Sequence, residues 1–325
     1  MKYTLSLAIS GLLFITAITS CKKGNDGPGT TEFQAITFKF GTDSVSINID
    51  NAVKEVKNMP RGYDVTQLGA SAILPNGYSI SPDAATTKDY TKGVTYTVTT
   101  NQGSTYTVKI TAPAYDAVTN PYGIYNAKQL SDIRKGLNDS YVLMNDIQLP
   151  DMTASNAATT TGISDYKDHG WYSIGSRYVN GGNVIFRGTL DGQNHVIKNY
   201  TTKYRSIGDP LPAGIDAGHD GKSTDGMFGY ATKATFKNIG IQLAPAGLIA
   251  SSSDDGYGDV GGLVGMADSC IITNCFVTGN SNIAADQNVG GLVGKSWYST
   301  ISKSYASLTS ASGNYVITSQ SDGGG

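Results

Sequence analysis

Two acidic loops contain the residues whose types and spacing come closest to a metal site. Their carboxylates are Asp216, Asp220 and Asp225 in IDAGHDGKSTDG and Asp254, Asp255 and Asp259 in SSSDDGYGDVGG. Calcium takes about six to eight oxygen ligands, which such loops supply through carboxylates, backbone carbonyls and water. Neither spacing matches an EF-hand or a calcium-binding nonapeptide repeat, so solvated turn residues are the simpler interpretation. We expect no metal site and keep Asp254, Asp255 and Asp259 as the alternative calcium ligands.

The histidines and lysines form no catalytic pattern. His195 lies in LDGQNHVIKN, where we expect a structural role, and the sequence contains no HExxH. Polysaccharide lyases and glycosidases need a base or paired carboxylates on one surface. The lysines of the repetitive region instead occur singly, as Lys233, Lys237, Lys295 and Lys303. We therefore expect no catalytic residue, no enzyme activity and no cofactor, and a carbohydrate-active enzyme is the alternative.

Aromatic side chains near the motif boundaries are the candidates for ligand binding. Exposed aromatic rings stack on sugar rings, and tyrosine adds a hydroxyl group that forms hydrogen bonds. We expect ligand contacts from Tyr257, Trp297 and Tyr298, whereas other aromatic residues, Tyr305 among them, fill the core or cover strand edges. The net charge of −2 gives no basic surface for nucleic acid, so we expect no nucleic-acid partner.

The first residues have the pattern of a bacterial export signal. MKYTLSLAISGLLFITAITSC has a lysine after Met1 and then an apolar stretch that is too short to span a membrane. Ile18-Thr19-Ser20-Cys21 resembles the lipobox of bacterial lipoproteins. The resemblance implies a signal peptide over residues 1–20 and acyl chains on Cys21. An ordinary secretory signal with a chance cysteine is the alternative.

The lipobox resemblance also implies where the protein is held. Residues 21–32, rich in Gly, Lys and Thr, then form a flexible tether to the outer membrane, in which the acyl chains are buried. Lys22 and Lys23 follow the cysteine, where many surface-exported lipoproteins of this kind have acidic residues. The cell surface and the periplasmic face therefore both remain open.

The other two cysteines, Cys270 and Cys275 in CIITNC, leave two interpretations. Export permits a disulfide, but their spacing along one strand points the two side chains to opposite faces. A bridge therefore needs a bend between them, and otherwise both cysteines are small buried apolar residues.

The segment over residues 33–112 alternates apolar and polar residues as β-strands do. Ile36, Phe38 and Phe40 alternate with polar residues, and two similar runs flank the turn Asn101-Gln102-Gly103, which indicates a hairpin. Charged residues make up only 15 % of the chain and glycines number 40, which favours an extracellular all-β protein over a helix-rich enzyme. We expect a small immunoglobulin-like β-sandwich.

A linker over residues 113–124 leads to the single expected helix. Asn126 is a candidate N-cap with Gln129 three residues later, as in a capping box. Leu130, Ile133 and Leu137 fall on one helical face. A helix that directly precedes a repetitive region can close the end of a stacked core, so we expect a short N-terminal capping helix.

Repeats dominate the region over residues 125–325. VGGLVG occurs at Val260–Gly265 and again at Val289–Gly294. The repeat residues are Gly261, Gly262, Leu263, Val264 and Gly265, then Gly290, Gly291, Leu292, Val293 and Gly294. Alignment with GMFGY predicts three columns: Thr235, Ile271 and Ile301; Asn238, Asn274 and Ser304; Ile239, Cys275 and Tyr305. Units of this length bury their apolar faces only by stacking, which predicts a β-solenoid with glycine at tight corners.

Two family resemblances follow from these motifs. GGLVG followed by a strand, together with FRGTLDGQNHVIKNY and GMFGY upstream, resembles the GLUG motif and its preceding rungs. This implies a right-handed β-solenoid of bacterial surface proteins, often lipoproteins and many of them described as adhesins. The segment MPRGYDVTQLGASAILPNGYSISP resembles the N-terminal domains of Bacteroidetes surface lipoproteins, which act mostly as spacers. The terminal SDGGG resembles the start of a third repeat, so we expect a truncated solenoid.

The expected function follows mainly from these resemblances. We expect an all-β, lipid-anchored adhesin that contacts a glycan or protein of a host or neighbouring cell through the faces and inserted loops of its solenoid. The alternatives are a polysaccharide lyase or glycosidase, and a passive structural component of the envelope.

Overall fold

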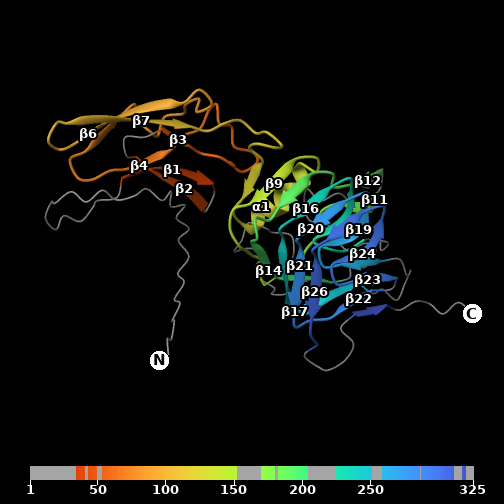
Figure 1. Cartoon of the computed structure of the whole chain (residues 1–325). Coiled ribbons are helices and arrows are strands. Elements are labelled where there is room, and N and C mark those ends of the chain that lie inside the picture. The colour runs from red at the N-terminus through yellow and green to blue at the C-terminus, as the bar shows by residue number, and fades with distance from the viewer. Residues whose placement is uncertain are drawn as a thin grey trace, which may run out of the picture. The chain divides into compact units, whose positions relative to one another are not determined.

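A computed structural model of the chain (Figure 1) describes residues 34–40, 43–49, 53–151, 170–179, 182–203, 224–250, 258–285, 287–310 and 317–319. The regular secondary structure of these residues is mostly β-strand, with one short α-helix, α1 (Ala127–Ser131), and one 3-10 helix, η1 (Asp132–Lys135). None of these helices has the length and apolar character that crossing a membrane requires. The chain divides into two compact units, and Lys57–Tyr63 groups with the second unit rather than the first.

The first unit contains two β-sheets. One has the order β2-β1-β4 and the other β3-β7-β6-β5. The strands are β1 (Ala35–Phe40), β2 (Asp43–Asn48), β3 (Val53–Glu55), β4 (Ser71–Ile73), β5 (Ser79–Ser81), β6 (Val94–Thr99) and β7 (Thr105–Thr111). Tyr96 pairs with Val108 and Val98 with Tyr106 in the antiparallel pair β6–β7, so the predicted hairpin is confirmed.

Aromatic residues fill the core of the first unit. Phe38, Tyr90 and Tyr96 are fully buried, and the rings of Phe38 and Tyr90 meet edge to face with centroids 5.1 Å apart. The hydroxyl groups of Tyr90 and Tyr96 lie 2.5 Å apart and hydrogen-bond to each other. Each buried hydroxyl therefore has a polar partner, which removes the cost of taking it out of water.

The segment over residues 57–63, which we expected inside the sandwich, bonds to the start of the second unit. The Asn58 backbone N–H donates to Asn120 Oδ1 at 2.8 Å, and Asn58 Nδ2 donates to the Pro121 carbonyl at 2.8 Å. Arg61 Nε lies 2.9 Å from Asp139 Oδ2. The residues of this unit are thus drawn from two separate parts of the chain.

The second unit consists of short strands that pair mainly in parallel. The six-stranded sheet has the order β25-β20-β16-β13-β9-β8, and a second has the path β10-β14-β17-β21-β26, with β22 beside β17 and β27 beside β22. Smaller sheets have the orders β15-β19-β24, β18-β23 and β11-β12. The strands of the six-stranded sheet are β8 (Tyr122–Ile124), β9 (Ser140–Leu143), β13 (Thr189–Asp191), β16 (Thr235–Lys237), β20 (Ile271–Thr273) and β25 (Thr300–Ser302).

The remaining strands complete the stack. The second sheet contains β10 (Ile147–Gln148), β14 (Val196–Lys203), β17 (Gly240–Ala250), β21 (Phe276–Gly279), β22 (Ile283–Ala285), β26 (Tyr305–Leu308) and β27 (Ile317–Ser319). The smaller sheets contain β11 (Ser176–Val179), β12 (Gly182–Val184), β15 (Phe228–Thr232), β18 (Asp259–Gly261), β19 (Val264–Asp268), β23 (Asn288–Gly290) and β24 (Val293–Trp297).

The repeats stack in register, with one correction. Ile271 pairs with Thr300, where the alignment predicted Ile301. Phe276 pairs with Tyr305, where the alignment placed Tyr305 beside Cys275. Both pairs have the same sequence separation as Val260 and Val289, which pair at the start of the two VGGLVG motifs. No residue is therefore inserted between motif and strand, and the predicted columns of the third repeat were one residue too late.

Large apolar side chains fill the interior of the second unit. The rings of Phe186, Phe228 and Phe236 are fully buried and lie with centroids 4.7 to 5.5 Å apart. Cys270 and Cys275 are both buried and unbridged, which matches the interpretation as small apolar residues. Burial raises the pKa of the Cys275 thiol to about 11 and raises that of Cys270, so both thiols are protonated near neutral pH.

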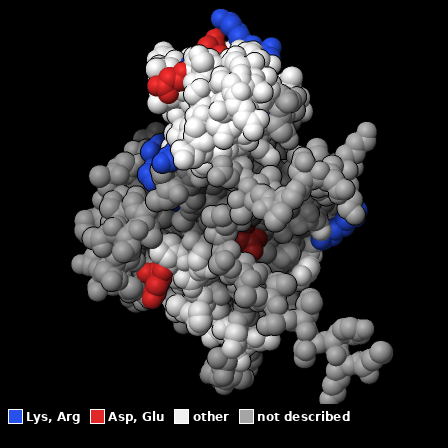
Figure 2. Space-filling model, turned by 90° about the vertical axis from the view of Figure 1, so that its left-hand side faces the viewer, with Lys and Arg blue, Asp and Glu red and all other residues white. Residues whose placement is uncertain are grey.

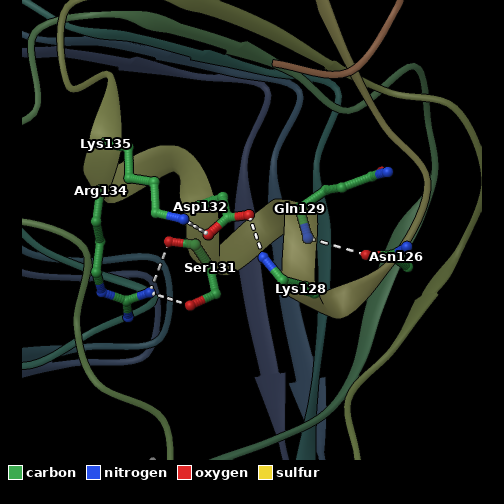
Figure 3. A network of polar contacts seen from close by, with 7 residues as sticks. All are labelled: Asn126, Lys128, Gln129, Ser131, Asp132, Arg134 and Lys135. Carbon is green, nitrogen blue, oxygen red and sulfur yellow. Dashed lines mark hydrogen bonds and ion pairs between the residues drawn. The ribbon is translucent and has the colours of Figure 1, made fainter. Parts of the chain in front are cut away.

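The helix starts where the capping residues predict (Figure 3). Asn126 Oδ1 accepts the Gln129 backbone N–H at 2.9 Å. The Gln129 side chain accepts the Tyr125 backbone N–H at 2.7 Å. Arg134 Nη1 donates to the carbonyl and the hydroxyl oxygens of Ser131. Leu130 and Ile133 are fully buried in the hydrophobic core of the second unit. The helix thus covers apolar surface at the start of the stack.

Candidate ligand-binding groove

An irregularity in the pair β14–β17 shapes the outer face of the second sheet. Ile197 pairs with Ile241, but Thr202 pairs with Leu248, so β17 has extra residues relative to β14 between these pairs. Extra residues on one strand of a pair bend and twist the sheet locally, and such bulges often lie beside functional sites. Strands β14, β17, β21 and β26 neighbour one another in this sheet (Figure 1).

Two buried hydroxyl groups hold the irregular part of β17. Ser281 Oγ donates to the Ala244 carbonyl at 2.6 Å, and Thr201 Oγ1 donates to the Gly247 carbonyl at 2.6 Å. These carbonyl groups lie in the stretch where pairing with β14 is interrupted, so the hydroxyl groups replace the missing sheet hydrogen bonds. Pro245 lies between them and has no N–H to leave unsatisfied.

The outer face is hollowed into an open groove of about 360 Å³ at this place. The groove is lined by Gln148, Lys198, Asn199, Gln242, Leu243, Ala244, Pro245, Gly279 and Asn280, which come from β10, β14, β17 and the end of β21. Leu243 and Ala244 are buried and form an apolar floor, whereas Gln148, Gln242 and Asn280 are exposed. The groove therefore combines carboxamide groups with a patch of apolar surface.

The positive charge at the groove is compensated by a neighbouring carboxylate. Lys198 Nζ lies 2.7 Å from Asp146 Oδ2, and His195 Nδ1 lies 3.4 Å from Asp146 Oδ1. Burial alone would raise the pKa of Asp146, but hydrogen bonds from Lys198, the Val196 backbone and His195 outweigh it and hold the pKa below its usual value. Asp146 is therefore ionised at neutral pH and forms an ion pair with Lys198.

An aromatic pair lies on the neighbouring strands of the same sheet. Phe276 in β21 and Tyr305 in β26 stack with centroids 5.5 Å apart and an angle of 11° between the rings. Phe276 lies over Gly240, where an added Cβ would be 2.4 Å from the ring. Tyr305 is 56 % exposed, so it does not fill the core. A glycine in β17 thus makes room for an aromatic surface beside the groove.

Of the three residues predicted to contact a ligand, the structure describes two, Trp297 and Tyr298. Trp297 and Tyr298 are exposed at the end of β24, with Lys295 Nζ 4.9 Å from the centre of the Trp297 ring. Neither residue lines the groove. Tyr257 and the lipidation site Cys21 lie outside the described residues. Their roles stay predictions.

The two acidic loops end side by side. The Asp225 backbone N–H donates to the Asp259 carbonyl at 2.9 Å, and both side chains are buried. Asp259 Oδ1 accepts from Asn288 Nδ2 at 2.6 Å. Asp254 and Asp255 lie outside the described residues, and within the described ones no three His, Cys, Asp or Glu side chains are grouped as metal ligands. The calcium alternative stays a prediction.

The glycines of VGGLVG lie where neighbouring backbone approaches closely. An added Cβ at Gly261 would be 2.3 Å from the Val264 carbonyl oxygen and 2.6 Å from the Gly294 nitrogen. An added Cβ at Gly290 would be 1.9 Å from the Val293 carbonyl oxygen. Between the glycines, Leu263 and Val264 are buried, and Leu292 and Val293 are half-buried. The motif therefore has a structural role in stacking one repeat on the next.

The residues that line the groove were not singled out from the sequence. A signal was present, because two of the lining residues, Lys198 and Gln242, each follow a buried Ile in the neighbouring strands β14 and β17. Pro245 within the apolar run IQLAPAGLIA was a second signal, since proline in a strand marks an edge or a bulge. Neither signal reveals a hollow by itself.

Two segments of the chain match models of known families. Residues 35–112 match the family model described as SGBP, N-terminal, which represents a Bacteroidetes-type surface glycan-binding domain. Residues 256–283 match the GLUG motif. No curated protein and no solved structure matches the chain. The two matches support a protein of the cell surface, of the Bacteroidetes type.

Proposed function

We propose that this protein binds glycans at the bacterial cell surface and that the groove over β10, β14, β17 and β21 is the binding site. The match of residues 35–112 to the SGBP N-terminal family carries the glycan-binding part of the proposal. The groove supports the location, because it presents carboxamide side chains above an apolar floor. Sugars offer hydroxyl groups at their edges and C–H groups on their faces, and such a surface matches both.

The finer architecture belongs to the same proposal. The strands of successive repeats pair in parallel, as β16 does with β20 and β20 with β25, which supports a right-handed β-solenoid as the second unit. The two sheets of the first unit support an immunoglobulin-like sandwich. In this arrangement the solenoid stacks its strands so that residues of successive strands share one outer face, which carries the binding surface.

The proposed anchor is a lipid on Cys21 in the outer membrane, and the proposed role is adhesion through glycans. Mass spectrometry of the protein purified from bacterial membranes tests the anchor, with Cys21→Ser as the control that loses the acyl mass and the membrane association. Proteolysis of intact cells distinguishes the cell surface from the periplasmic face. A Cys21→Ser protein that stays in the membrane fraction contradicts the anchor.

We further propose that the protein acts by binding alone, without catalysis and without a cofactor. The groove supports this, because none of its lining residues is an acid and the nearby Asp146 forms an ion pair with Lys198. Incubation with polysaccharides, followed by assays for reducing ends and unsaturated products, tests it. Product formation contradicts the proposal, as does a binding activity that is lost on addition of EDTA.

Glycan binding itself is tested on a glycan array with soluble protein that begins after Cys21. We expect retention of a polysaccharide by wild-type protein and weaker retention by Gln242→Ala, since the Gln242 side chain lines the groove. Gln287→Ala serves as the matched control, because Gln287 is exposed and lies outside the groove. Absence of retention of any glycan contradicts the proposed function.

A further inference from the structure

We infer that the groove selects a neutral, extended glycan chain that lies across β10, β14, β17 and β21. The inference rests on the proposed function and goes beyond it, because it states the charge and the shape of the ligand. Three features carry it: the charge balance of the lining residues, the hydrogen-bonding groups that the lining leaves open, and the width of the groove.

The charge balance disfavours acidic glycans. Uronates and sulfated sugars are bound by cations whose charge is not already compensated. Lys198 is the one charged residue among the described residues that line the groove, and its ammonium group lies 2.7 Å from Asp146 Oδ2. His195 lies on the other oxygen of the same carboxylate, at 3.4 Å. A ligand carboxylate or sulfate would therefore approach Asp146 as well as Lys198, whereas an uncharged sugar meets no such repulsion.

The open hydrogen-bonding groups match hydroxyl groups. Asn199 Nδ2 donates to the carbonyl oxygens of Leu149 and Pro150, which fixes the amide and leaves Oδ1 as an acceptor. Asn280 Oδ1 accepts from Thr309 Oγ1 at 3.3 Å, which leaves its Nδ2 as a donor. Gln242 is exposed, and among the described residues its side chain has no hydrogen-bond partner. The groove therefore offers an acceptor on Asn199, a donor on Asn280 and the amide of Gln242. Sugar hydroxyl groups, which both donate and accept hydrogen bonds, can bind to all three.

The width of the groove favours a chain of sugars over a single one. The lining residues come from four neighbouring strands, and adjacent strands lie about 4.8 Å apart, so the groove extends about 14 Å across the sheet. Phe276 and Tyr305 continue the same sheet onto β26. Because the main-chain carbonyls of Ala244 and Gly247 are held by Ser281 and Thr201, this surface is preformed.

The experiment measures binding of soluble protein to neutral polysaccharides (β-glucan, mannan, xylan) and to acidic ones (polygalacturonate, alginate, dextran sulfate) by calorimetry at two salt concentrations. We expect binding to a neutral polymer that does not change with salt. Gln242→Ala should weaken this binding about threefold to tenfold, and Gln287→Ala should leave it unchanged. The monosaccharide should bind far more weakly than the polymer.

A variant that changes the charge at the groove tests the inference with acidic polymers, so the test does not depend on having chosen the right neutral polysaccharide. Asp146→Asn keeps an acceptor for the Val196 N–H but releases the charge of Lys198. We expect this variant to gain salt-sensitive binding of the acidic polymers. Binding of acidic polymers by wild-type protein, without neutral ones, overturns the inference and leaves the proposed function standing. Neutral binding that Gln242→Ala does not weaken also overturns the inference, and no binding to any polymer overturns the proposed function.

Discussion

Glycine at a few positions of this chain is required by the closeness of neighbouring backbone. At Gly261 an added methyl group would lie 2.3 Å from one backbone oxygen and 2.6 Å from a backbone nitrogen, so neither neighbour can move without shifting a strand. Its nitrogen also donates to the Asp225 carbonyl, which ties it to the preceding repeat. The glycine of the repeated hexapeptide is therefore needed for close packing between repeats, and we assign it no chemical role.

Gly261→Ala should lower the stability of the second unit by about 1–3 kcal/mol, the usual cost of overpacking. Gly69→Ala in the first unit is the comparison: an added Cβ there lies 3.2 Å from the Ala85 carbonyl oxygen, a milder contact, so we expect a smaller loss of stability. Denaturant unfolding followed by circular dichroism measures both. Equal stability of Gly261→Ala and the wild type would show that the repeats do not pack as closely as described.

Asp191 links the stability of the second unit to pH. Burial alone would raise its pKa, but hydrogen bonds from Asn238, the Gln193 backbone and Lys237 hold the pKa below its usual value. A carboxylate with a lowered folded-state pKa stabilises fully above its unfolded value of about 3.9, and this stabilisation is lost as the pH falls through the folded-state pKa.

We therefore expect Asp191→Asn to be less stable than wild-type protein at neutral pH and the difference to shrink in acid. Unfolding free energies measured by denaturant titration at a series of pH values below and above the unfolded pKa test this. A difference that stays constant across the acidic range would mean that the lost stability comes from packing and not from the charge.

At the scale of elements, capping residues fix where the helix begins, but apolar spacing does not fix where it ends. Leu130, Ile133 and Leu137 predicted one continuous helical face. The α-helix ends at Ser131 and continues as a 3-10 helix to Lys135, and Leu137 lies beyond it. The Leu137 carbonyl instead accepts the N–H groups of Arg187 and Gly188, so Leu137 contacts a distant segment rather than extending the helix.

Asn126→Ala should destabilise the second unit by about 1 kcal/mol, because the Gln129 N–H loses its side-chain acceptor. Asn126→Ser should retain most of the stability, since serine is an equally good N-cap. Thermal unfolding of the three proteins makes the comparison. A serine variant as unstable as the alanine variant would mean that the Asn126 side chain stabilises through contacts other than the cap.

In the whole molecule, local sequence patterns predicted the hairpin and the stacked strands of the repeats. They did not predict the groove, which forms where the strand pairing becomes irregular. The hairpin of β6 and β7 follows from alternation and turn residues, and the stacking of the second unit follows from motifs that recur along the chain. The groove depends on a mismatch between β14 and β17, strands that lie far apart in the sequence. Because such a mismatch is a property of two distant segments together, neither segment predicts the hollow alone.

The proposed glycan site lies on the outer face of β10, β14, β17 and β21. Hydrogen–deuterium exchange with a saturating neutral polysaccharide measures this directly, because a bound chain protects the backbone amides that it covers. We predict slower exchange in peptides that contain β14, β17 and the end of β21, and unchanged exchange in β6 and β7. Protection confined to β6 and β7, or to the Trp297 region alone, would contradict the account.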